Sequence, residues 1–212
     1  MDNYRITIDT FNTLAQRYQE RYMDVKAYHD GFDVFCQLIT KQNASVLEIG
    51  CGPGNVTCYL LQQRPDFKLH GIDLAPNMVE LARQNNPSAT FEVMDARNIH
   101  ELTPGYDAVM CAFCLPYLSK EDVAKFFNDC AQLLNPNGVL YLSTMEDDYT
   151  KSGFENSSDG KHKAYLYYHH EDHLRPMLET QGFDLVSLNR QKFEKSATEF
   201  MTDLIIVAQK MD

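Results

Sequence analysis

The chain has no tryptophan, no run of basic residues and no long apolar stretch. Its 19 Lys and Arg stand against 30 Asp and Glu, a formal net charge of −11. Nucleic-acid and anionic membrane surfaces are bound by clustered Lys and Arg, so we expect neither as a partner. No segment approaches the roughly 18 apolar residues of a membrane-spanning helix. The first residues also lack the basic-then-apolar order of a signal peptide, and we therefore expect a cytoplasmic protein.

Six cysteines are present, and this number fits a reducing compartment in which free thiols pack as small apolar groups. Cys111 and Cys114 have the C-x-x-C spacing of redox and zinc sites. No second pair supplies further ligands, and the motif ends an apolar, strand-like run. Core packing is favoured over the metal or redox reading, and we predict no metal site.

At 212 residues, with 44% hydrophobic and 23% charged residues, the chain suits one domain with a large core. Helical spacing of apolar residues covers 8–41 and returns at 56–63, 76–85, 120–134 and 171–181. Short strands are expected at 46–49, 68–73, 90–94, 106–112, 139–144, 183–188 and 203–208. This alternation predicts a doubly wound α/β fold with a seven-stranded, mostly parallel sheet and helices on both faces.

The carboxyl-terminal third departs from this alternation. Residues 146–163 are polar and rich in Gly, Ser, Asp and Lys, and we expect a loop or mobile lid there. The last two strands have no helix between them. We therefore expect them to pair antiparallel, joined by residues 190–201, so that the last strand is antiparallel to the sheet.

A glycine-rich turn follows the first strand, in the segment 46–55 with the sequence VLEIGCGPGN. Glycine has no Cβ and permits positive φ, so a ligand can lie against bare backbone there. The next helix points its unpaired N–H groups at the same place. The pattern is G-x-G-x-G, with Asn55 where dinucleotide dehydrogenases carry their third glycine. It predicts a ligand-binding turn at the carboxyl edge of a parallel sheet.

Two carboxylates accompany this turn. Glu48 ends a buried strand, where it needs a partner, and a ligand ammonium group would supply one whereas a pyrophosphate would not. The alternative is that Glu48 pairs within the protein. Asp73 ends the second strand, where an acidic residue can accept both ribose hydroxyls. Its alternative role is that of a carboxylate at a helix N-terminus.

Four further segments complete an ordered set, namely GIDLAPNM at 71–78, EVMDA at 92–96, YDAV at 106–109 and LLNPNGVL at 133–140. With the glycine turn, they resemble the class I S-adenosylmethionine-dependent methyltransferases that act on small molecules, over about residues 11–208. Ala75 stands where the family usually has Ser. The resemblance implies a Rossmann-like methyltransferase fold in one domain, 1–212. Residues 1–41 would form a helical lid, 42–145 the cofactor-binding core, and 146–212 the substrate-side segment with the final strand pair.

The resemblance also implies S-adenosylmethionine as cofactor and a set of residues that contact it. They are Tyr18, Glu48, Gly50, Cys51, Gly52, Asp73, Leu74, Met78, Asp95, Ala96 and Phe113. Glu48 would orient the methionine amino group, and Asp73 would bind the ribose. Asp95 would accept from the adenine amino group, while the Ala96 N–H donates to the ring. Tyr18 would help to hold the methionine carboxylate, although its spacing suits plain helix packing equally well.

Methyl transfer from a sulfonium needs mostly positioning and the exclusion of water, and a general base only where the acceptor must lose a proton. The candidate catalytic residues are Tyr117, His169 and His170, and further substrate-side groups are Tyr149, Tyr165, Tyr167, Tyr168 and His173. The histidines could also bind a metal or lie on an ordinary surface. The partner expected is a small molecule, and the accepting atom and the oligomeric state stay open. An NAD(P)-dependent oxidoreductase and a non-catalytic S-adenosylmethionine-binding module are the alternatives. A nucleic-acid methyltransferase is disfavoured by charge.

Overall fold

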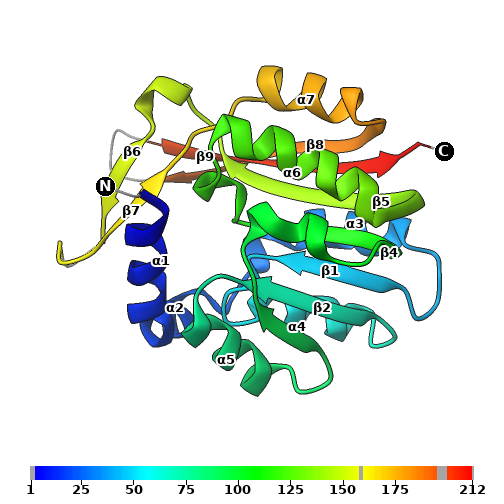
Figure 1. Cartoon of the computed structure of the whole chain (residues 1–212), viewed down its shortest axis with the longest axis horizontal. Coiled ribbons are helices and arrows are strands. Elements are labelled where there is room, and N and C mark those ends of the chain that lie inside the picture. Colours follow the sequence, from blue (N-terminus) through cyan, green and yellow to red (C-terminus); the bar gives the residue numbers. More distant parts are fainter. Residues whose placement is uncertain (1–2, 158–159, 195–199, 212) are drawn as a thin grey trace.

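The computed structural model describes residues 3–157, 160–194 and 200–211, and within them a seven-stranded sheet forms the centre (Figure 1). The strand order is β3-β2-β1-β4-β5-β9-β8. The bounds are β1 Ser45–Ile49, β2 Lys68–Asp73, β3 Thr90–Val93, β4 Tyr106–Cys111, β5 Leu134–Met145, β8 Phe183–Glu194 and β9 Phe200–Lys210. Strands β1 to β5 pair parallel, whereas β9 lies antiparallel between β5 and β8. The predicted fold class, and the antiparallel last strand, are confirmed.

Helices cover both faces of this sheet, as predicted. One face packs against α3 His29–Leu38, α4 Asn55–Gln63 and α5 Pro76–Asn85, and its core includes Phe32, Phe35 and Leu60. The other packs against α6 Lys120–Leu133, α7 Glu171–Thr180 and the short helix η2 Ala96–Glu101. Residues of the parallel strands alternate between these two cores, because successive strand side chains point to opposite faces. This burial on both faces is why the strands read as short, continuous apolar runs.

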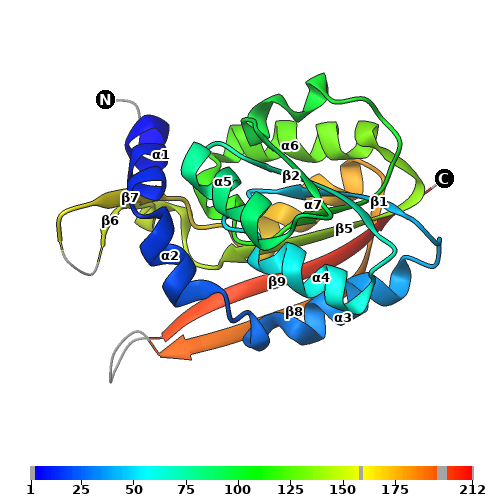
Figure 2. The ribbon, with the colours of Figure 1, turned by 90° about the horizontal axis from the view of Figure 1, so that it is seen from below.

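The amino-terminal segment predicted as helical over 8–41 is divided in the structure. It contains α1 Asn3–Thr13, α2 Ala15–Tyr22, the short helix η1 Lys26–Tyr28, and α3. Helix α1 lies beside a two-stranded hairpin, β6 Gly153–Asn156 and β7 Lys163–Leu166 (Figures 1 and 2). The Tyr165 N–H donates to the Thr7 hydroxyl at 2.9 Å, and the Thr10 hydroxyl donates to the Lys163 carbonyl at 2.7 Å. These bonds fix α1 at the carboxyl edge of the sheet.

Two predictions for the carboxyl-terminal third were wrong. Residues 146–163 are not only a loop, since they hold the short helix η4 Tyr149–Lys151 and the strand β6 with the start of β7. The ring contact between Phe154 and Tyr165, with centroids 5.1 Å apart, joins the two strands of that hairpin. The connection expected at 190–201 is largely strand, because β8 continues to Glu194 and β9 begins at Phe200. Residues 195–199 lie outside the described residues.

Candidate functional site

A pocket opens at the carboxyl edge of the sheet, beside the ends of β1, β2 and β4. These three strands are neighbours, since Glu48 pairs with Gly71 on one side and with Met110 on the other. The pocket, with about 950 Å³ of space including its open mouth, is also lined by α1 and α2. Nine of the residues assigned to the cofactor by resemblance line it, namely Tyr18, Gly50, Gly52, Asp73, Leu74, Met78, Asp95, Ala96 and Phe113. Tyr117 lines it as well.

The glycines of the turn have different structural reasons to be glycine. All three have positive φ, at 67° for Gly50, 51° for Gly52 and 80° for Gly54. A Cβ on Gly50 would lie 2.8 Å from the Cβ of Cys114, so this glycine permits a close contact inside the protein. A Cβ on Gly52 would meet nothing nearer than the Tyr18 ring at 4.0 Å. Gly52 therefore leaves bare backbone facing the pocket, where a side chain would take up ligand space.

Asp73 holds the turn together from the end of β2. One carboxylate oxygen accepts from the Gly52 N–H at 2.9 Å, and the other accepts from the Ala75 N–H at 2.8 Å. Burial raises the pKa of Asp73 above its usual value, and these backbone donors oppose the rise. Each carboxylate oxygen has a second lone pair that a ligand hydroxyl could use. The alternative role at a helix start is also present, because α5 begins directly after Ala75.

Asp95 is tied to an arginine that sequence reasoning missed. It caps η2 by accepting from the Arg97 N–H at 2.9 Å, and it also accepts from the Arg97 Nε at 3.0 Å and Nη2 at 2.5 Å. Burial raises the pKa of Asp95, but the hydrogen bonds from Arg97 outweigh it and hold the pKa below its ordinary value. The guanidinium lies 4.0 Å from the ring centre of Tyr4. The D-x-R spacing of Asp95 and Arg97 is a sequence signal for their pairing. No signal in the sequence indicates that Tyr4 lies against Arg97.

Glu48 and Cys51 do not line the pocket. Glu48 is 2% exposed, and its carboxylate accepts from the Thr57 hydroxyl, which is the pairing within the protein that the sequence left open. Burial raises the pKa of Glu48 to about 8, and the bond from Thr57 opposes the rise. Cys51 is 1% exposed and packs over Gly71. A Cβ added to Gly71 would lie 3.1 Å from the Cβ of Cys51. Only the Cys51 backbone belongs to the turn.

Aromatic side chains close the other side of the pocket. Phe113 has φ of 61°, which is uncommon for a residue with a Cβ, and its N–H donates to the Ser143 hydroxyl at 2.9 Å. The Tyr117 ring packs edge-on against Phe11, with centroids 5.0 Å apart, and the Tyr18 ring lies 5.9 Å from the same Phe11. Burial raises the pKa of Tyr117, so its phenol keeps its proton near neutral pH. Tyr117 can therefore act as a hydrogen-bond donor or as a packing surface, rather than as a general base.

The two candidate histidines lie elsewhere. His169 is 1% exposed, with Nε2 3.0 Å from the Leu118 carbonyl oxygen, and burial lowers its pKa to about 4. His170 caps α7, accepting from the Asp172 N–H at 3.3 Å. It lines a second pocket, together with Tyr149 and His173. The other tyrosines flagged from the sequence lie on or beside the hairpin, where Tyr165 and Tyr167 have ring centroids 4.8 Å apart and the Tyr168 N–H donates to Ser152.

Within the ranges that the structure describes, no group of three or more His, Cys, Asp or Glu is arranged to hold a metal ion. All six cysteines are free thiols, and Cys111 is fully buried, in keeping with the core-packing interpretation. Among the same described residues, no helix is long and apolar enough to cross a membrane.

The known proteins that this chain resembles are methyltransferases. The family profile described as a methyltransferase domain matches residues 46–138. The malonyl-[acyl-carrier protein] O-methyltransferase of Acetivibrio thermocellus is 34% identical over 109 residues, which are 50% of this chain and 38% of that protein. The trans-aconitate 2-methyltransferase of Escherichia coli is 37% identical over 104 residues, or 49% and 40% of the two. This chain thus spans about two fifths of the length of these two relatives.

Among solved structures, the magnesium protoporphyrin IX methyltransferase of Synechocystis PCC 6803 with bound S-adenosylhomocysteine has the same fold. Its TM-score is 0.73 at 22% identity, over 99% of this chain and 100% of that one. The likeness therefore extends over the whole architecture, including the amino-terminal helices and the final strand pair.

Proposed function

We propose that the chain is a class I S-adenosylmethionine-dependent methyltransferase, in keeping with the methyltransferase-domain profile that matches residues 46–138. It binds S-adenosylmethionine in the pocket at the carboxyl edge and transfers the methyl group to a small molecule. The observation that carries the proposal is the open backbone at Gly52, which shares one pocket with the carboxylates of Asp73 and Asp95. Bare backbone at Gly52, with carboxylate acceptors at the end of β2 and just after the end of β3, suits an extended nucleoside bearing an amino-acid tail.

The residues of the pocket have separate parts in this proposal. Asp73 accepts from the ribose hydroxyls, because its second lone pairs remain available beside the backbone donors. Leu74 and Met78 pack near the adenine. The Asp95 carboxylate accepts a hydrogen bond from the adenine amino group, and the Ala96 N–H donates one to the adenine ring. For Asp95, the adenine amino group must share the carboxylate with Arg97.

The bound cofactor supplies a methyl group on a sulfonium, which is already a good leaving group. The chain's own contribution is to position the acceptor and exclude water. Phe11, Phe113 and Tyr117 form an aromatic wall for this purpose. Glu48 lies beneath the turn rather than in the pocket, so its assignment to the methionine amino group requires a measurement of its own, described below.

Calorimetric titration with S-adenosylhomocysteine and with NAD tests the proposal. We expect binding of S-adenosylhomocysteine at about micromolar concentration and no binding of NAD. Gly52→Ala should weaken binding by at least about tenfold, because the new Cβ points into the ligand space. Gly182→Ala is the matched control, since Gly182 also has positive φ, at 79°, with nothing within 4 Å, and it does not line the pocket. Binding of NAD instead would overturn the proposal.

The alternative of an NAD(P)-dependent oxidoreductase is not supported, since the matched family profile is that of a methyltransferase domain. A non-catalytic module that only binds the cofactor is distinguished by activity. Transfer of a labelled methyl group from S-adenosylmethionine to any component of a metabolite extract supports the enzyme. Cytoplasmic location and the absence of a nucleic-acid partner stay predictions from the sequence.

A further inference from the structure

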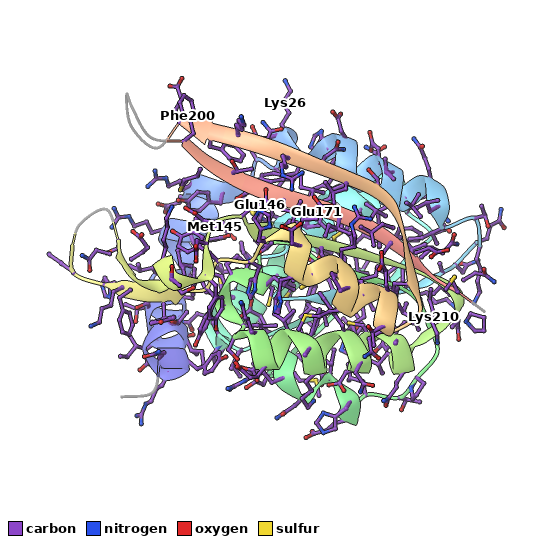
Figure 3. The ribbon with its side chains drawn as sticks, turned by 90° about the horizontal axis from the view of Figure 1, so that it is seen from above. Lys26, Met145, Glu146, Glu171, Phe200 and Lys210 are labelled. Atoms are coloured by element: carbon purple, nitrogen blue, oxygen red, sulfur yellow. The ribbon has the colours of Figure 1, made fainter. Side chains whose placement is uncertain are left out.

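Strand β9 brings a carboxylate to the edge of the sheet at which the pocket opens. Asp203 pairs with Met145, the last residue of β5. Because β9 runs antiparallel to β5, its beginning lies where the parallel strands end. Figure 3 shows this arrangement, with Met145 and Phe200 at one end of the sheet and Lys210 at the other. The carboxyl ends of the strands are where ligands bind in open α/β sheets.

Asp203 is partly buried and has a hydrogen-bond partner that reaches toward the pocket. The Tyr28 hydroxyl donates to its Oδ2 at 2.5 Å. The Tyr28 ring in turn packs edge-on against Phe113, with centroids 4.5 Å apart, and Phe113 lines the pocket. Burial raises the pKa of the Tyr28 phenol, and the negative charge of Asp203 raises it further. Neither Asp203 nor Tyr28 is among the described residues that line the pocket, so Asp203 is connected to the pocket wall through the contact of Tyr28 with Phe113.

The charges around Asp203 favour a cation as its partner. Among the described residues, no Lys, Arg or His forms an ion pair with Asp203. The groups near it include the phenols of Tyr28 and Tyr141 and, on the neighbouring strand β8, the uncharged Gln191. Arg97 is the one basic side chain among the described residues lining the pocket, and it is already paired with Asp95. An anionic acceptor would therefore meet no available cation, whereas an ammonium group would meet a carboxylate and aromatic rings.

We propose that the methyl acceptor is an amine, that its ammonium group binds the Asp203 carboxylate beside Tyr28 and Phe113, and that Asp203 accepts its proton. This inference rests on the proposed methyl transfer. The ammonium N–H bond breaks and its proton passes to the Asp203 carboxylate. The freed nitrogen lone pair forms a bond to the methyl carbon, while the carbon–sulfur bond breaks and its electron pair stays on sulfur. The products are the N-methylammonium ion and S-adenosylhomocysteine, and Asp203 then gives its proton to water.

A purely structural role would be to tie the start of α3 to β9 through Tyr28. Asp203→Asn separates the two roles, because the amide oxygen still accepts from Tyr28 while the charge is lost. The chain offers a matched control in Asp33→Asn. Asp33 accepts from the Tyr59 hydroxyl at 2.5 Å, so it forms the same kind of pair, and neither Asp33 nor Tyr59 is among the described residues that line the pocket.

The probes are two matched series: phenethylamine, 2-phenylethanol and phenylacetate, and butylamine, 1-butanol and butyrate. Each is titrated into the complex with S-adenosylhomocysteine and assayed for uptake of labelled methyl. We expect an amine to be preferred over its alcohol by at least about tenfold, and the acids not to bind. Asp203→Asn should lower kcat/KM for the amine at least about tenfold and remove the acid limb of its pH profile. Asp33→Asn should leave both unchanged, and both variants should keep their affinity for S-adenosylhomocysteine.

If S-adenosylhomocysteine binds but no amine binds its complex better than the matched alcohol, the inference is wrong and the proposed function stands. The same holds if Asp203→Asn behaves like Asp33→Asn. If neither S-adenosylhomocysteine binding nor methyl transfer to any acceptor is found, the proposed function itself fails.

Discussion

Glu48 makes the stability of this protein depend on pH in a direction opposite to that of a salt-bridged carboxylate. Its folded-state pKa of about 8 lies above the ordinary 4.5, because burial disfavours the charged form. The folded state therefore holds this proton more tightly than the unfolded chain does. Stability is greatest below pH 4.5 for this group and is lost as the pH rises toward 8. Linkage puts the loss at about 4 kcal/mol by pH 8.

The perturbation is Glu48→Gln, which keeps an oxygen for the Thr57 hydroxyl and cannot ionise. Urea unfolding followed by circular dichroism, in steps between pH 4.5 and 8, measures the free energy of unfolding. We expect the variant to gain about 4 kcal/mol over the native protein across this interval. Glu101→Gln, at an exposed position in η2, should follow the native profile. Equal pH dependence in the native protein and in Glu48→Gln would refute the burial argument.

The same variant tests the assignment of Glu48 to the methionine amino group. An ammonium group at Glu48 would favour the carboxylate, so binding S-adenosylhomocysteine near pH 7 should release about one proton. Calorimetry in buffers of different ionisation enthalpy counts that proton. We expect the release in the native protein and none in Glu48→Gln. Release that persists in the variant would assign the amino group to another partner.

Three further outcomes are expected. Because burial lowers the pKa of His169 to about 4, native stability should fall as the pH drops from about 6.5 toward 4, by about 3 kcal/mol, and His169→Gln should abolish this fall in thermal melts. Gly50→Ala should cost roughly 2 kcal/mol in urea unfolding, because its Cβ would meet Cys114 at 2.8 Å, and a change near zero would contradict the contact. Arg97→Met, which loses both the contact with the Tyr4 ring and the hydrogen bonds to Asp95, should speed dissociation of S-adenosylhomocysteine about fivefold in stopped-flow measurements, and an unchanged rate would show that Arg97 does not retain the ligand.

Local patterns in the sequence predicted the parallel core and the glycine turn of the pocket, and the family resemblance supplied most of the other pocket residues. Short apolar runs between helical segments specify buried strands, and the residues that follow such strands must meet at one sheet edge. This is why Asp73 could be assigned to the ligand-binding edge from the pattern, whereas Asp95 and Phe113 were assigned to the same place by the resemblance to the methyltransferase family. The long hairpin of β8 and β9 was underestimated, since its outer part has exposed polar residues that resemble a loop.

The sequence by itself determined where backbone freedom is required and which strand ends carry carboxylates, because both are consequences of residue type and short-range spacing. Only the tertiary structure decided which hydrogen-bond partner each carboxylate has. It paired Glu48 with Thr57 beneath the turn, and Asp203 with Tyr28 from a distant part of the chain. The physical reason is that burial and partnership of a charged group depend on packing between elements, which no local pattern records.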